Sequence, residues 1–89
     1  MKWEVQLSSK AEKYYHRLPE KIRKKVLTEL FKLSILDIVL SHPDVKPLIG
    51  KLKGFYRLRV GKYRVIFGLL KNEGIIAVVN IHPRGDVYK

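Results

Sequence analysis

The stretch FYRLRVGKYRVIFGLLKNEGIIAVVNI, residues 55–81, decides the fold. It consists of three runs rich in β-branched and aromatic residues, at 55–60, 63–70 and 74–81. Gly61-Lys62 separates the first two runs, and a four-residue segment ending in Gly74 separates the last two. Short glycine-containing separators between such runs are typical of β-hairpins. We therefore predict three antiparallel strands in a meander.

One strand and a short helix are predicted near the N-terminus. Trp3, Val5 and Leu7 alternate with polar residues, which is the period of a half-buried strand. Ser9 and Glu12 then fit a capping box, in which the two side chains bond to the free amides of a helix start. The apolar spacing that follows predicts a helix over residues 9–18.

A second helix is predicted to begin at Pro19 and to continue to Leu40. Two adjacent apolar rows give it a broad packing face: Ile22, Val26, Leu30 and Leu33, and Leu27, Phe31, Ile35 and Ile38. Its end, residues 35–40, is apolar nearly all round, so we expect either deep burial or a covering partner there. Ser41 to Asp44 stop the helix, and the segment through Gly54 has the pattern of a basic loop.

The order strand, helix, helix, strand, strand, strand favours an α+β fold, a small, mainly antiparallel four-stranded sheet with a two-helix hairpin on one face. A chain of 89 residues has room for a single domain, 1–89. The absence of cysteine excludes disulfides and a thiolate nucleophile. Since no apolar run is long enough to cross a bilayer and no signal peptide is evident, we expect a cytoplasmic protein that does not associate with membranes.

The charge balance points to an anionic partner. The sequence has 19 Lys+Arg against 8 Asp+Glu, a formal net charge of +11. Self-repulsion at this density makes a polyanion or an acidic protein the expected neutraliser. Between Asp44 and Glu73 the chain has no acidic residue. Seven cations gather from position 46 to position 64: Lys46, Lys51, Lys53, Arg57, Arg59, Lys62 and Arg64.

The arginines of the first two meander strands are predicted to share a sheet face. Alternation along 55–60 places Arg57 and Arg59 on one face and Leu58 on the other, toward the helices. We assign Arg64 to the open face as well, because burial of an unpaired charge is prohibitive. One guanidinium group can bind two phosphate oxygens at once, and aromatic rings stack on nucleobases. This face therefore suits an RNA backbone. The alternative is a solvated face whose cations serve no ligand.

Other chemistries find little support in the sequence. His16, His42 and His82 lack metal-ligand spacing, so we expect no metal and no cofactor. His82, close to Arg84 and Tyr88 along the chain, is either a supporting residue of a site or a structural or surface histidine. The carboxylates form no acid-base pair, and we find no nucleophile elbow, P-loop or dinucleotide-binding turn.

Two segments resemble the RelE/ParE toxin superfamily: LKGFYRLRVGKYRVIF at 52–67 and VNIHPRGDVYK at 79–89. The likeness extends over the whole chain in length and element order. It implies a single RelE-like toxin domain with a fold like that of microbial ribonucleases, acting as the toxin of a type II toxin-antitoxin pair. On the RelE branch it implies a metal-independent endoribonuclease, an mRNA interferase that cuts messenger RNA in the ribosomal A site.

The same resemblance implies roles for individual residues. Arg57 and Arg59 match basic residues around the scissile phosphate, Arg64 the arginine that stabilises the phosphorane, and Arg84 an arginine near the leaving oxygen. Tyr88 matches a tail tyrosine that acts as a general base or stacks on a nucleobase of the RNA. Relatives often have lysine in place of Arg59, and guanidinium does not give up its proton, so the predicted mechanism relies on charge. The expected RNA-binding residues around these five are Lys51, Lys53, Lys62 and His82.

Two further functions remain open at the level of sequence. One is a ParE-like toxin that inhibits DNA gyrase without nuclease activity, and the other is a remnant without catalysis that binds an antitoxin. For either toxin we expect a small acidic antitoxin, in a heterotetramer or similar assembly, besides the messenger RNA on the ribosome. The antitoxin is expected to cover the basic face and the apolar end at 35–40 with an amphipathic helix or strand.

Overall fold

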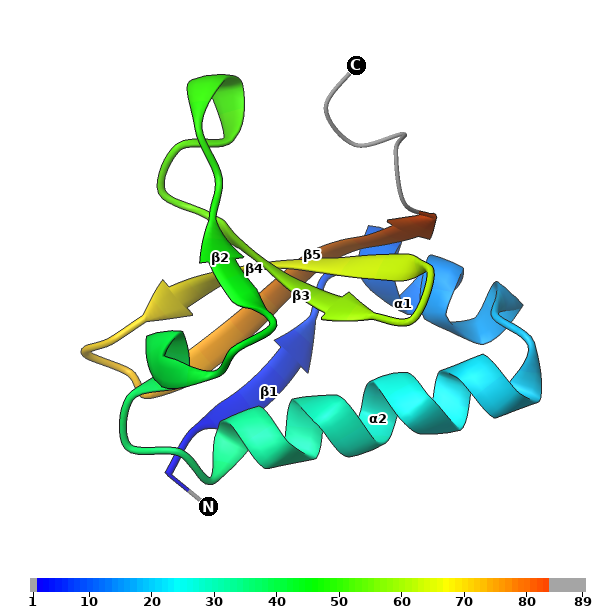
Figure 1. The fold of residues 1–89 in the computed structure, drawn as a ribbon, viewed down its shortest axis with the longest axis horizontal. Helices are drawn as coiled ribbons and strands as arrows, with labels where there is room; N and C mark the ends of the chain where they lie inside the picture. Colours follow the sequence, from blue (N-terminus) through cyan, green and yellow to red (C-terminus); the bar gives the residue numbers. More distant parts are fainter. Residues whose placement is uncertain (1, 84–89) are drawn as a thin grey trace.

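The predicted meander lies at the centre of the computed structural model, which describes residues 2–83. Its strands are β3 (Tyr56–Val60), β4 (Tyr63–Leu70) and β5 (Ile75–Pro83), as expected. Gly61 and Gly74 adopt positive φ angles of 58° and 67° in the two connections, a conformation that favours glycine. The prediction of an antiparallel meander is therefore confirmed (Figure 1).

The sheet has five strands and is mixed, so the prediction of a four-stranded, mainly antiparallel sheet was wrong in part. The strand order is β1-β5-β4-β3-β2. The N-terminal strand β1 (Glu4–Leu7) pairs with β5 in parallel, and β2 (Val45–Pro47) pairs with β3 in antiparallel. The segment of β2 was expected to be loop because three residues that include a proline give no alternation. Proline is tolerated there since β2 is an edge strand.

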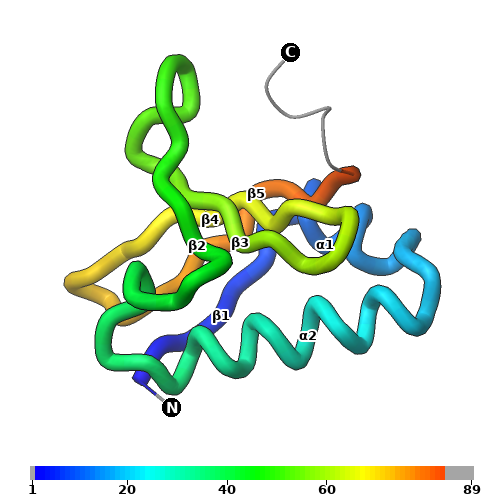
Figure 2. The backbone as a smooth tube through the Cα atoms, viewed as in Figure 1, coloured from blue at the N-terminus to red at the C-terminus, as the bar shows by residue number. Residues whose placement is uncertain are grey.

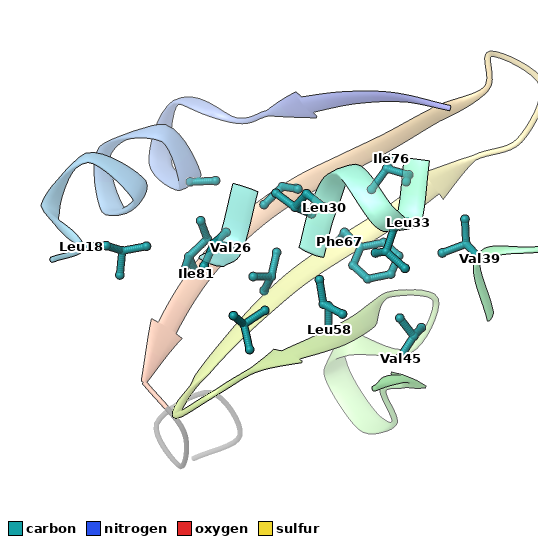
Figure 3. Packing of buried hydrophobic residues seen from close by; sticks show 14 residues of the cluster. Leu18, Val26, Leu30, Leu33, Val39, Val45, Leu58, Phe67, Ile76 and Ile81 are labelled. Atoms are coloured by element: carbon teal, nitrogen blue, oxygen red, sulfur yellow. The ribbon is translucent and has the colours of Figure 1, made fainter. Parts of the chain in front are cut away.

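Two helices, α1 (Ser9–Arg17) and α2 (Glu20–Ser34), contribute to a single core on one face of the sheet. Figure 3 shows Leu30 and Leu33 of α2 beside Leu58 and Phe67 of the sheet. The buried cluster comprises Ala11, Leu18, Val26, Leu30, Leu33, Val39, Val45, Leu58, Val60, Val65, Phe67, Ile76, Val78 and Ile81. Within residues 2–83, none of the helices combines the length and the apolar character that a bilayer crossing requires.

The cap of α1 is one residue earlier than predicted. Ser8, not Ser9, is the N-cap, and its hydroxyl accepts a hydrogen bond of 3.1 Å from the Ala11 amide. The same hydroxyl donates to the carbonyl of Val79 at 3.2 Å. The contact with strand β5 therefore favours Ser8 over Ser9 as the cap, a choice that the local sequence pattern does not determine.

Helix α2 ends at Ser34, six residues before the predicted end at Leu40. The Ser34 carbonyl accepts bonds from the amides of Lys2 and Trp3, both 2.9 Å, so this end is joined to the N-terminal segment. Residues 35–38 follow without a helix, and a single 3₁₀ turn, η1 (Val39–Ser41), comes next. Of the two expectations for 35–40, burial holds only for Val39 at 2%, whereas Ile38 is 66% exposed.

Candidate nucleic-acid interface

A row of three basic or titratable side chains crosses the sheet on the face opposite the core. Arg59 of β3 pairs directly with Arg64 of β4, and Arg64 pairs with His82 of β5. Direct cross-strand partners have Cβ atoms roughly 4.5–5.5 Å apart. One step along β3, Arg57 lies between Lys46 of β2 and Ile66 of β4. We call Lys46, Arg57, Arg59, Arg64 and His82 together the arginine face.

A β-bulge brings His82 onto this face. The pairing of β4 with β5 shifts register between Ile66 and Phe67, which oppose Asn80 and Val78. The extra residue, Val79, inverts the alternation, so that Ile81 joins the core and His82 faces the arginines. The Ser8 amide and hydroxyl bond to the carbonyls of Val78 and Val79, at 2.8 and 3.2 Å. Ser8 therefore braces the bulge that positions His82.

Asp44 brings the guanidinium groups of Arg57 and Arg59 together. Its carbonyl accepts a bond of 3.0 Å from Arg57 Nη1, and its carboxylate lies 3.0 Å from Arg59 Nη2. The Arg59 amide also donates to the Asp44 carbonyl at 3.0 Å. Both side chains are thus oriented by one residue just before β2. Arg59 keeps 53% of its side chain exposed, so an incoming anion can reach it.

Asp44 is itself held by contacts that lead back to α2. Its amide donates to His42 Nδ1 at 3.0 Å, which leaves the proton of a neutral imidazole on Nε2. His42 Nε2 lies 3.7 Å from Glu29 Oε1, and Glu29 also pairs with Lys32 at 3.1 Å. The exposed fractions of the His42 and Glu29 side chains are 13% and 22%. Helix α2 thereby helps to fix the turn that orients the two arginines.

The arginine face rests on apolar side chains. Ile66, between Arg57 and Asn80 in the register, is only 2% exposed although it is on this face. The ring of Phe55 covers Gly68, where a Cβ would be 3.4 Å from the ring, so a larger residue would crowd it. The Nε of Arg64 and the Nε2 of His82 are both buried atoms. Cations above a partly dehydrated surface attract anions more strongly than cations in bulk water do.

The remaining predicted residues lie in the connections before and after β3 or outside the described part. Lys51 and Lys53 are exposed in the loop around η2 (Gly50–Leu52), which extends beyond the sheet in Figure 2. Lys62 is exposed in the turn at the other end of β3. Arg84 and Tyr88 lie outside the described residues. Among residues 2–83, no three His, Asp or Glu side chains gather as metal ligands would.

Two contributors to the site were missed by the sequence prediction. Asp44 was noted only as the acidic residue before the basic segment, and its carboxylate instead pairs with Arg59. Lys46 was counted in the charge but not in the site, because its segment was expected to be loop. A short strand at a sheet edge has no strong sequence signal, so only the pairing with β3 reveals that Lys46 opposes Arg57.

Solved structures with the same fold are toxins and toxin-antitoxin complexes. The RelE-RelB complex of Pyrococcus horikoshii OT3 matches with 27% identity and a TM-score of 0.78, covering 97% of this chain and 99% of that one. The RelBE2 complex of Mycobacterium tuberculosis matches with 22% identity and a TM-score of 0.76, covering 94% and 100%. The YoeB-YefM complex of Staphylococcus aureus has 20% identity and a TM-score of 0.71, covering 92% and 97%. No curated protein sequence matches the chain.

The family model and the structural matches together identify a toxin of the RelE/ParE superfamily. The model of the ParE toxin of type II toxin-antitoxin systems, parDE, matches residues 5–88, and the chain belongs to this family. The protein is accordingly a toxin of a type II toxin-antitoxin system. The resemblance seen in the sequence is confirmed at the level of the superfamily.

Proposed function

We propose that this toxin is a metal-independent endoribonuclease that cleaves messenger RNA, with the ribosomal A site as the place of cleavage. The observation that supports it most directly is the convergence of Arg57, Arg59 and Arg64 on one sheet face. Like charges directly opposite one another destabilise a sheet. Asp44 already pairs with Arg59, and an anion such as a phosphodiester that reaches both Arg59 and Arg64 would further offset their repulsion.

In the proposed reaction the 2′-hydroxyl of one ribose attacks the adjacent phosphorus, and the bond from phosphorus to the 5′-oxygen breaks. The 2′-hydroxyl loses its proton and the leaving 5′-oxygen gains one, so the products are a 2′,3′-cyclic phosphate and a 5′-hydroxyl. In the transition state, negative charge develops on the non-bridging oxygens of the phosphate. Arg57, Arg59 and Arg64 stabilise that charge, and one well-placed donor of this kind contributes about 2.7–4 kcal/mol.

Proton transfer needs side chains that can lose or gain a proton and that lie beside the phosphate. A guanidinium stays protonated, so the arginines supply charge and orientation only. His82 is the titratable side chain that directly opposes Arg64 in the described part of the sheet, and we assign it a supporting role beside the phosphate. Arg84 and Tyr88, which follow His82 along the chain, remain the proposed leaving-group and tail residues.

Inhibition of DNA gyrase is the second candidate function, and the family to which the chain belongs favours it, since this family is named for the ParE toxin. A gyrase inhibitor acts by binding a protein and needs no array of cations around a phosphate. The arginine face therefore supports the nuclease more strongly. The two functions predict different damage in the cell, namely cut messenger RNA or broken DNA.

The distinguishing experiment is induced expression followed by primer extension on a translated message and by gel analysis of chromosomal breaks. The nuclease predicts new RNA ends within the reading frame and intact DNA. The experiment also compares two variants. Arg64→Ala removes a cation of the arginine face, and Arg23→Ala is its matched control, because Arg23 lies on α2 and is remote from this face. Toxicity with intact messages and accumulated DNA breaks would instead establish the gyrase inhibitor.

A partner accompanies the proposed activity. Uncontrolled cleavage of messages harms the cell that makes the toxin, and we propose a small acidic antitoxin as its inhibitor, in a heterotetramer or similar assembly. The structural relatives described above include toxins bound to antitoxins. The +11 charge favours an acidic chain. Because translated message is the proposed substrate, we place the toxin in the cytoplasm.

A further inference from the structure

The arginine face is bordered by apolar side chains that lie outside the core. Ile66 is 2% exposed and Leu48 is 8% exposed, yet neither belongs to the buried cluster between the sheet and the helices. Phe55 is half-buried and comes two residues before Arg57. Tyr56, which separates them, packs against the core, so alternation along the chain places Phe55 beside the arginines. This side of the sheet therefore offers an aromatic ring as well as cations.

The position of the Phe55 ring is fixed by the neighbouring strands. The Leu48 amide donates to the Phe55 carbonyl at 3.0 Å, which continues the pairing of β2 with β3 one step beyond Pro47 and Tyr56. Across β3, the ring lies over Gly68 of β4, where a Cβ would be 3.4 Å from a ring carbon. Because Gly68 has no side chain, the ring lies close to the backbone of the sheet. A ring that is held in place before binding loses little freedom when a ligand stacks on it.

Cations lie on both sides of this ring along the chain. Lys51 and Lys53 precede it in the loop around η2, and Arg57 follows it on the same side of the sheet. Two residues of a strand span roughly 7 Å, so a phosphate bound at Arg57 would bring the neighbouring nucleotide close to the ring. Proteins hold single-stranded nucleic acid with this combination, in which cations bind the backbone and aromatic rings stack on the bases.

We propose that Phe55 forms a nucleobase subsite, in which the base next to the arginine-bound phosphate stacks on the ring. The proposal rests on the proposed binding of RNA by the arginine face, and it adds a contact to the base. A phenyl group has no hydrogen-bond donor or acceptor, and every nucleobase has a π-face. We therefore expect the subsite to accept all four bases. It requires an unpaired base, since a base inside a duplex is already stacked on its neighbours.

The test measures, by fluorescence anisotropy at one salt concentration, the affinity of the purified toxin for two 2′-O-methyl oligoribonucleotides of equal length. One strand carries its bases and the other is abasic, so they have equal charge and differ in stacking. The wild type should prefer the strand with bases. Phe55→Leu keeps an apolar side chain over Gly68 and should reduce this preference at least about fivefold, the lower end of what one stacked base contributes. Its affinity for the abasic strand should not change.

Two further variants separate stacking from packing. Phe55→Tyr retains an aromatic ring and should retain the preference for bases. Tyr14→Leu is the matched control for loss of a ring, because Tyr14 is exposed on α1, which packs on the other side of the sheet. Urea denaturation verifies that each variant folds. A measurement that needs no substitution is the nuclear Overhauser effect between Phe55 ring protons and base protons, which we expect in the wild-type complex.

The subsite would be overturned if Phe55→Leu kept the preference, weakened binding of both strands equally, or lost no more of it than Tyr14→Leu. Absence of the Overhauser effect in the wild-type complex would overturn it as well. Cleavage of translated message by the wild type reports on the nuclease separately. A wild type that cuts message but binds the two strands alike would remove the subsite and leave the nuclease. Preference for bases without cleavage would remove the nuclease alone.

Discussion

Neighbouring residues of strand β3 point to opposite faces of the sheet, and the two faces differ in burial and in charge. Leu58 is fully buried against the helices, whereas the next residue, Arg59, keeps 53% of its side chain exposed. One face is joined to the helices by apolar packing, which stabilises the fold. The other gathers cations, of which Arg59 is paired with Asp44, and a bound anion would further offset their mutual repulsion. Stability and the proposed chemistry are therefore separated across the thickness of a single sheet.

The largest expected effect concerns the core face. Phe67→Ala should lower the free energy of unfolding by about 3–5 kcal/mol, because the ring is 0% exposed and its removal leaves a cavity. Leu70→Ala on the same strand, at 46% exposure, should change it by less than about 0.5 kcal/mol. Urea denaturation followed by circular dichroism measures both. Equal losses would mean that the two faces do not differ in packing as described.

On the arginine face the expected loss is in activity. Arg64→Ala should reduce cleavage of translated message by about 10²- to 10³-fold, the cost of removing one donor to a developing oxyanion. We expect the free energy of unfolding to change far less than the rate of cleavage, because Arg64 directly opposes another cation, Arg59, in the strand register. Single-turnover cleavage assays and denaturation of the same samples provide the two numbers. Undiminished cleavage would reject the role of Arg64.

Ser8 joins the two faces, because it caps α1 and braces the bulge beside His82. Ser8→Ala should destabilise the protein by about 0.5–2 kcal/mol, as loss of an N-cap does. Ser9→Ala, at the position that the sequence favoured as the cap, should cost less than about 0.5 kcal/mol. Thermal unfolding compares the pair directly. A larger loss from Ser9→Ala would restore the original capping prediction.

Asp44 is expected to show the smallest effect. Asp44→Asn removes the carboxylate that pairs with Arg59 but keeps the carbonyl that accepts from Arg57. Because the pair is partly exposed, we expect stability to change by less than about 1 kcal/mol. The loss of a negative charge beside the arginines should lower KM, and looser placement of Arg59 should lower kcat by about fivefold or less. Steady-state kinetics on RNA would contradict this if both constants stayed unchanged.

The sequence predicted the core face well and the site only in part. The three strands of the meander and the packing face of α2 follow from the periodicity of nearby residues, so the sequence predicted both. The parallel pairing of β1, the edge strand β2 and the bulge at Val79 depend on contacts between distant segments. Consequently Lys46 and Asp44 were missed, and the position of His82 beside Arg64 could not be derived from simple alternation. The early end of α2 likewise depends on bonds from Lys2 and Trp3.

The proposed nuclease requires that the arginines of β3 and β4 jointly bind a ribonucleotide phosphate. Titration of the side-chain NMR resonances with a 2′-O-methyl oligoribonucleotide, which cannot be cleaved, tests it most directly. We expect the signals of Arg57, Arg59 and Arg64 to shift together, while those of Arg17 and Arg23 on the helices stay in place. Shifts confined to the helix arginines, or equal shifts of all five, would contradict it.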